Sequence, residues 1–255
     1  MSTLMPLIWV ILSSFKTNQE IFTSTFSLPR EWQIQNYINA IRLDGLFEAF
    51  RNTIAVSVIC TFITTLVASM ASYALMQKFK LTKKIYYFLI AGIYVPINAF
   101  MVPYFILSIV TKTYNTIWAL IMVYSAINLP MAVLILKAYM DTIPKEICES
   151  AVVDGCSFSK TFFKIILPLS LPGMSTIGVF QFIMPWNEFL FATILTQDKA
   201  SRTLQVSIRF FMGTFVVDYA SMFATMVVCL VPTIFAYILF QEQVISGLTS
   251  GALKA

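Results

Sequence analysis

The sequence contains no histidine and few charged residues. Only 11% of its 255 residues are Asp, Glu, Lys or Arg, whereas ordinary soluble domains carry roughly 25%. The absence of histidine removes the commonest general base and a frequent zinc and haem ligand. The four cysteines Cys60, Cys148, Cys156 and Cys229 form no C-x-x-C pair, so we interpret them as free thiols and expect no metal site and no cofactor.

The sequence also lacks a nucleotide-binding loop. The nearest approach to G-x-x-x-x-G-K-[ST] is GMSTIGVF, starting at Gly173, which has no lysine. We therefore predict that this chain does not itself hydrolyse ATP and is not an enzyme. Its formal charge of +5 comes from lysines and arginines set between apolar runs, an arrangement typical of membrane flanks, so we expect no nucleic-acid partner.

Long apolar runs are what the sequence has in abundance. Hydrophobic residues make up 58% of the chain, and a helix needs about 20 mostly apolar residues to cross a bilayer. We predict an all-α, polytopic membrane protein with a single domain over residues 1–255 and a lipid bilayer as its surroundings. About six transmembrane helices are expected, at 4–15, 52–76, 85–110, 116–136, 171–195 and 219–240.

The first of these spans is the shortest. Residues 4–15 reach only about 18 Å at 1.5 Å per residue, so this helix is either partly interfacial or shortened at its start. Orientation follows from Lys78, Lys80, Lys83 and Lys84, which lie between spans two and three without any acid. By the positive-inside rule that loop is cytoplasmic, and both termini are then cytoplasmic as well.

A charged passage, residues 141–170, interrupts the apolar runs between spans four and five. Asp141 or Thr142 can cap a short helix that has Pro144 in its first turn and Glu146 near its positive end. Gly155 suits the left-handed position that ends such a helix. Ser157 can cap a second short helix, which contains Phe162 and which Pro168 and Pro172 should end.

The first short helix has a face of small residues. Ile147, Ala151 and Gly155 recur at i, i+4 and i+8, with Glu149 and Asp154 at the edge. Small side chains would let another surface approach closely. The residues alone leave two interpretations open, namely an amphipathic hairpin lying in the membrane interface and a docking element for a partner.

The order E-A-A, three residues, G, nine residues, I-x-L-P is found in the coupling loop of ABC importer permeases, and this passage resembles it. Here it is Glu149-Ser150-Ala151, then Gly155, then Ile165-x-Leu167-Pro168, with Ser150 as the one departure. Pro144 and Asp154 resemble the carbohydrate-uptake branch, in particular the maltose-type second permease. FKTNQEIF from Phe15, MPWNEFLFATIL from Met184 and the tail GLTSGALKA from Gly247 resemble that branch too.

This resemblance implies a sugar permease subunit in the plasma (inner) membrane of a prokaryote. Its implied partners are a second homologous permease, two cytoplasmic ABC ATPase subunits and an extracytoplasmic sugar-binding protein. The loop would couple to the ATPases through Glu146, Glu149, Ser150, Ala151, Asp154, Gly155, Phe162 and Pro168. The C-terminal tail, residues 243–255, would contact the same ATPases through Gly247, Thr249, Gly251 and Lys254.

Polar residues inside the apolar runs are candidates for the transport pathway. Glu188 is the only charged side chain deep in a predicted span, at a cost of about 3 kcal/mol if ionised, so it needs a partner or water. Gln181, Trp186 and Asn187 lie near it, and Asn98 and Asn128 stand beside prolines. These groups suit a sugar ring and its hydroxyls, but they could instead hold neighbouring helices together or satisfy backbone freed by proline.

Two other function classes remain to be separated from a sugar permease. An ABC permease for another solute would share the coupling loop. A self-contained secondary transporter would need a dense set of intramembrane acids or of breaks within helices for ion coupling. Six spans with Glu188 as their one acid supply little of that.

Overall fold

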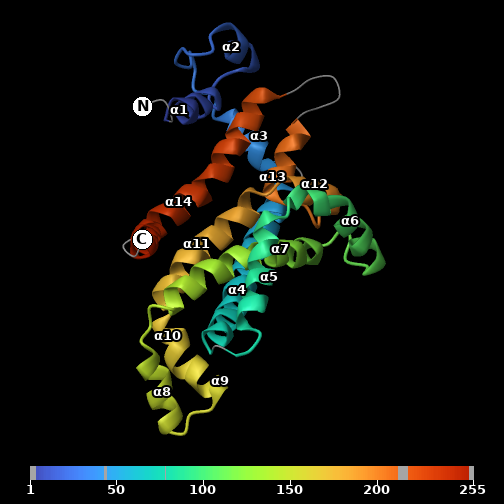
Figure 1. Ribbon diagram of the computed structural model, residues 1–255. Helices are drawn as coiled ribbons and strands as arrows, with labels where there is room; N and C mark the ends of the chain where they lie inside the picture. Colours follow the sequence, from blue (N-terminus) through green and yellow to red (C-terminus); the bar gives the residue numbers. More distant parts are fainter. Residues whose placement is uncertain (1–3, 43–44, 78, 212–217, 253–255) are drawn as a thin grey trace.

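The computed structural model describes residues 4–42, 45–77, 79–211 and 218–252. Every regular element in these ranges is helical (Figure 1). The longer helices are α1 (Leu4–Ser13), α4 (Leu46–Met76), α5 (Thr82–Ala91), α6 (Met101–Val110), α7 (Ile117–Met140), α8 (Lys145–Val153), α11 (Leu171–Asn187) and α14 (Tyr219–Ala252). The shorter ones are α2 (Asn18–Thr23), α3 (Gln35–Arg42), η1 (Gly92–Tyr94), η2 (Ile97–Phe100), α9 (Phe158–Thr161), η3 (Phe162–Ile166), α10 (Leu167–Leu169), α12 (Leu190–Leu195), α13 (Leu204–Ser207) and η4 (Ile208–Phe211).

The centre of the bundle is α4 packed along α7 and α11. Small and weakly polar side chains of α4, including Ser57, Ala68 and Ser72, are fully buried. They let the helix axes approach closely, as is usual where lipid gives no hydrophobic drive to association. Ser72 Oγ donates to the carbonyl of Val133 on α7 at 3.4 Å.

By length and composition, α4 and α7 are the two helices in the described ranges that could each cross a membrane alone. Up to four spans result if each of two bent pairs counts as one, and the helices Leu4–Ser13 and Tyr219–Phe235 are apolar but shorter. The predicted spans at 52–76 and 116–136 correspond to α4 and α7. The total of six spans remains a prediction, because the apolar stretches Leu4–Ser13 and Tyr219–Phe235 are shorter than a full span.

The third predicted span, 85–110, is not one continuous helix. Its two halves, Thr82–Tyr94 and Ile97–Val110, meet at an angle of 92°. Pro96 has no N–H to continue the helix, and Val95 before it takes an extended conformation. The predicted span therefore consists of two helices joined at a sharp bend.

The fifth predicted span, 171–195, is also divided. Helix α11 ends at Asn187 and α12 begins at Leu190, because Glu188 has an extended backbone. Helix α14 is longer than the predicted 219–240, since its helical backbone continues to Ala252 and so includes most of the predicted tail.

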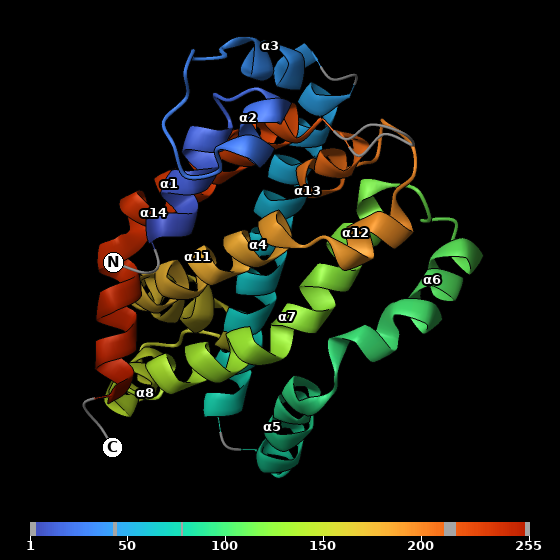
Figure 2. The same ribbon diagram turned by 90° about the horizontal axis from the view of Figure 1, so that it is seen from above.

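Several short helices lie at the two ends of the bundle (Figure 1). Helices α8, α9 and α10 project from the lower end, while α12 and α13 lie at the other end with the loops between them. Helix α6 lies on the opposite side of the bundle from α14 in both views (Figure 2).

Candidate functional site

The charged passage folds as a helical hairpin whose first arm is α8. The helix begins one residue after Pro144, which is its N-cap, so its start lies later than the predicted Asp141 or Thr142 cap. It ends in a Schellman motif, in which Cys156 N–H donates to the carbonyl of Ala151 at 2.9 Å and Gly155 N–H to that of Val152 at 3.0 Å. Gly155 has φ of +73°, as predicted for a left-handed end.

The structure corrects which face of α8 is available to a partner. Ala151 is only 3% exposed and Ile147 is half-buried, because both pack against their own chain. The opposite face carries Val152 and Val153, which are 67% and 87% exposed. We name the exposed surface around these two valines the α8 tip; Glu149, Ser150, Asp154 and Gly155 complete it, all exposed. Glu146 is exposed one turn earlier.

An apolar cluster fastens the hairpin to the bundle. It joins Tyr73 of α4, Met140 at the end of α7, and Ile143, Phe162 and Ile166 of the hairpin. Phe162 is 3% exposed and stacks on Tyr73 with ring centroids 5.4 Å apart. The hairpin is thus attached to α4 and α7 by a packed core.

The second arm of the hairpin leads directly into α11. Ser157 caps α9 by accepting the N–H of Lys160 at 3.4 Å, as predicted. The chain then widens into one π-helical turn, Phe162–Ile166. Pro168 does not end this arm as predicted, because the helix runs on to Leu169 and then bends by 75° into α11.

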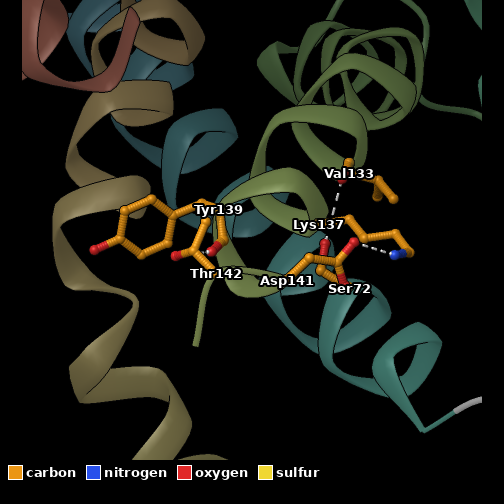
Figure 3. Close-up of polar contacts among 6 residues, drawn as sticks. All are labelled: Ser72, Val133, Lys137, Tyr139, Asp141 and Thr142. Atoms are coloured by element: carbon orange, nitrogen blue, oxygen red, sulfur yellow. Dashed lines mark hydrogen bonds and ion pairs between the residues drawn. The ribbon is translucent and has the colours of Figure 1, made fainter. Parts of the chain in front are cut away.

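The end of α7 presents different groups on two sides (Figure 3). Tyr139 lies on the side of α11, where a Cβ added to Gly173 would come within 2.6 Å of the tyrosine ring. Gly173 is therefore the residue that permits this close crossing. On the other side Lys137 Nζ lies 2.6 Å from Asp141 Oδ2, an ion pair at i, i+4.

Three of the predicted pathway residues line one cavity. Glu188, Asn98 and Asn128 border a space of about 530 Å³ between the break in α5/α6, the middle of α7 and the end of α11. The rest of its lining is mostly apolar and includes the ring of Tyr124. A mainly apolar cavity with a few convergent polar groups is the usual form of a small-molecule site.

Glu188 has partners on two sides. Tyr124 OH donates a hydrogen bond to Oε2. The backbone N–H groups of Leu190, Phe191 and Ala192 donate to the same carboxylate at 2.8, 3.0 and 3.1 Å. Glu188 therefore caps α12, where the helix dipole favours an anion, and holds α12 against α7.

Other predicted pathway residues lie outside this cavity. Trp186 is 1% exposed, stacks on Phe182, and donates its indole N–H to the carbonyl of Cys229 at 3.3 Å. These contacts support the alternative in which Trp186 holds neighbouring helices together. Gln181 is buried and its Nε2 lies 3.5 Å from the carbonyl of Asn128, and Asn187 is exposed and donates to the carbonyl of Ile183.

The predicted tail contacts fall where side chains are not described. The backbone of Gly247, Thr249 and Gly251 belongs to α14, and Lys254 lies outside the described residues. In the part of the chain that the structure describes, no cluster of three or more Cys, Asp or Glu residues is placed to hold a metal ion.

Three residues of these sites were not predicted from the sequence. Val152 and Val153 stand opposite Ile147 on a helical projection of α8, which was the signal for an apolar outer face. Tyr124 lies one turn before Asn128 on the same span, so the two side chains share one face of that helix. This spacing was the signal that Tyr124 could contact Glu188.

A bundle of apolar helices with broken spans and a hairpin fastened to its end defines a helical membrane protein of the transporter class. The comparisons identify the family. Residues 63–249 match the family described as "Binding-protein-dependent transport system inner membrane component", and the chain belongs to it. It is an ABC importer permease.

Curated relatives cover nearly the whole chain. It is 34% identical to the "Trehalose/maltose transport system permease protein MalG" of Thermococcus litoralis, over 98% of this chain and 91% of that protein. It is 32% identical to the "Diacetylchitobiose uptake system permease protein NgcG" of Streptomyces coelicolor, over 98% and 84%. A "Putative ABC transporter permease protein ORF2" of Caldicellulosiruptor is 34% identical over 98% and 91%.

A solved structure has the same fold. The "bacterial ABC transporter involved in the import of the acidic polysaccharide alginate" contains a chain that superposes with a TM-score of 0.83 at 18% identity, covering 94% of this chain and 90% of that one. This similarity is of the fold.

Proposed function

We propose that this chain forms half of the translocation pathway of an ATP-driven importer for a sugar or oligosaccharide. It is itself non-catalytic and works with a second homologous permease, two cytoplasmic ABC ATPases and an extracytoplasmic sugar-binding protein. Support for the sugar class comes from relatives whose names include trehalose, maltose and diacetylchitobiose. The whole chain, residues 1–255, is taken as one transmembrane domain in the inner membrane, with both termini cytoplasmic.

One observation carries the coupling mechanism, the exposed α8 tip on a hairpin that is packed into the bundle. Val152 and Val153 expose their side chains to solvent at the end of the molecule, with Glu149 and Asp154 beside them. An apolar centre with a charged rim is the usual composition of a protein interface. The ATPase binds the α8 tip and displaces it, and the contact between Phe162 and Tyr73 transmits this displacement to α4.

Energy transfer requires the tip to bind differently to the open and closed ATPase dimers. A partner that binds both states equally shifts no equilibrium. Ala151 and Ile147 act within the hairpin in this mechanism, since they hold α8 against its own chain. A bulky residue at Ala151 should therefore lower uptake by disrupting the packing of the hairpin.

The cavity lined by Glu188, Asn98 and Asn128 forms part of the wall of the pathway in this proposal. The two amides can donate to and accept from sugar hydroxyls. The angle between the two halves of the broken span exposes Asn98 on that wall. Glu188 orders the wall by capping α12 and binding Tyr124, so its contribution is structural.

Cross-linking from the α8 tip tests the proposal. In a chain with Cys148 and Cys156 replaced by serine, Val153→Cys should cross-link to an ABC ATPase in the assembled complex. Lys112→Cys, at the other end of the bundle, is the matched control and should not. Capture of no ATPase from a complex that imports sugar would refute the coupling site, and ATP-independent uptake by this chain alone in liposomes would favour a secondary transporter.

A further inference from the structure

A second cavity, of about 630 Å³, lies at the same end of the bundle as the hairpin. It is formed where α4 ends, α5 begins, and α7 passes into the hairpin. Its size is within the range of small-molecule sites, roughly 300–1,000 Å³. It shares no lining residue with the cavity around Glu188.

Its polar lining is strongly basic. Lys80, Lys83, Lys137 and Lys145 border the cavity, against the single carboxylate of Asp141. Asp141 pairs with Lys137, whose Nζ also lies 5.5 Å from the ring centroid of Tyr86. Lys80, Lys83 and Lys145 form no ion pair with the residues that the structure describes, so their charges are uncompensated in this cavity. Figure 3 shows the Lys137–Asp141 pair at this end of α7.

Apart from Thr82, the remaining lining is mainly apolar. Leu75, Met76 and Phe79 at the end of α4 and Tyr86 of α5 form much of the wall. A small soluble anion would contact only the lysines. A molecule with a charged head and an apolar body could contact both the lysines and the apolar wall. Just beyond the cavity, Tyr87 and Phe88 of α5 are 68% and 80% exposed, which places a lipid-facing surface beside it.

The position of the cavity matches the level of a lipid headgroup. It lies at the ends of α4 and α7, the two helices that are long and apolar enough to span a bilayer. Lysines at helix ends extend their charged groups to the interface while their methylene chains cover apolar surface. Basic pockets between transmembrane helices on the cytoplasmic side attract anionic headgroups.

We propose that this cavity binds one anionic phospholipid, with Lys80, Lys83 and Lys145 around its phosphate and an acyl chain against Phe79 and Tyr86. The bound lipid joins the α4–α5 loop to the first residues of the hairpin through Lys145, and so fixes the base of the hairpin in the membrane interface. This inference rests on the membrane placement in the proposed function but does not depend on the ATPase or the sugar.

Native mass spectrometry of the purified full chain tests the site. Dioleoyl-phosphatidylglycerol is the probe, and dioleoyl-phosphatidylcholine, with a zwitterionic head and the same acyl chains, is the comparison. At about 1 kcal/mol for each lysine, the double variant Lys80→Gln/Lys83→Gln should weaken binding of the anionic lipid about 30-fold. Both side chains are exposed, so the fold should persist, as thermal unfolding will check.

The matched control is Lys160→Gln/Lys164→Gln. It removes the same charge from exposed positions on the hairpin outside the cavity and should leave lipid binding within about twofold of wild type. The proposal is overturned if the two lipids bind equally, if the control weakens binding as much as the cavity variant, or if an equal concentration of inorganic phosphate displaces the lipid. Loss of lipid from the assembled complex would assign the cavity to a protein partner instead.

These outcomes are separate from those of the coupling proposal. Lipid binding is measured on the permease alone, without ATP or sugar. A chain that cross-links to an ATPase through Val153→Cys but binds both lipids equally would retain the importer function and lose only the lipid site.

Discussion

Replacing Phe162 by alanine should uncouple ATP hydrolysis from transport. Phe162 is buried where the hairpin meets α4, and its ring stacks on Tyr73 and meets Phe163 edge-on, with ring centroids 5.4 and 4.8 Å away. Phe163 is the next residue but is 53% exposed. The two phenylalanines therefore provide a matched pair of substitutions, one inside the packed junction and one outside it.

The size of the effect follows from burial. Truncating a fully buried phenylalanine to alanine costs about 3–5 kcal/mol in packing and cavity terms. A cost of 3 kcal/mol shifts an equilibrium between packed and detached hairpin more than a hundredfold. Phe163→Ala removes a largely solvated ring and should cost less than about 1 kcal/mol.

The assay compares ATP hydrolysis with sugar uptake in proteoliposomes containing the full importer. In the Phe162→Ala complex the α8 tip remains intact, so the ATPases should still bind and hydrolyse ATP while uptake falls at least tenfold. Phe162→Leu keeps most of the volume and should recover much of the uptake. Phe163→Ala should behave as wild type in both measurements.

Two results would refute this argument. Normal uptake by Phe162→Ala would mean that the junction with Tyr73 transmits no movement. Equal losses for Phe162→Ala and Phe163→Ala would mean that exposure, and not packing, determines the effect. Membrane yield and thermal unfolding of each variant separate uncoupling from misfolding.

Four further changes test other parts of the structure. Val153→Glu places a charge on a side chain that is 87% exposed, and should abolish ATPase copurification without lowering the melting temperature. Gly155→Ala should cost about 1–2 kcal/mol because φ is +73°, measured as thermal stability and uptake. Glu188→Gln replaces one of the two accepting oxygens and should cost about 1–2 kcal/mol in thermal unfolding. Gly173→Ala should destabilise the bundle by about 1–3 kcal/mol through its clash with Tyr139, with partial recovery by Tyr139→Leu.

Each of these changes has an outcome that contradicts it. Retained ATPase binding by Val153→Glu would place the docking surface elsewhere. Gly155→Asn should be milder than Gly155→Ala, since asparagine tolerates the left-handed region and nothing lies within 4 Å of the added Cβ; the reverse order would point to a steric cause. Unchanged stability of Glu188→Gln would remove its role as a cap. A Gly173→Ala protein as stable as wild type would mean that Tyr139 moves aside at little cost.

The correct predictions concern features that depend on neighbouring residues alone, namely the positions of two long helices and the ends of two short ones. Apolar runs of sufficient length predicted α4 and α7, with their ends misplaced by up to six residues, because twenty apolar residues have no stable alternative to a helix in lipid. Gly155 and Ser157 predicted the end of α8 and the start of α9, since these depend on one backbone conformation and one side-chain hydrogen bond.

Only the tertiary structure decided which face of each element is free. A helical projection of α8 contains both the Ile147–Ala151 face and the Val152–Val153 face. The first is turned toward its own chain, with Ile147 packed against the cluster of Phe162, and the second is exposed. The bends of the third and fifth spans likewise depend on what satisfies the freed backbone, and at Glu188 that is a carboxylate shared between α12 and Tyr124. Burial and pairing join residues far apart in the chain, so composition and spacing set the helices while long-range contacts determined their exposed surfaces.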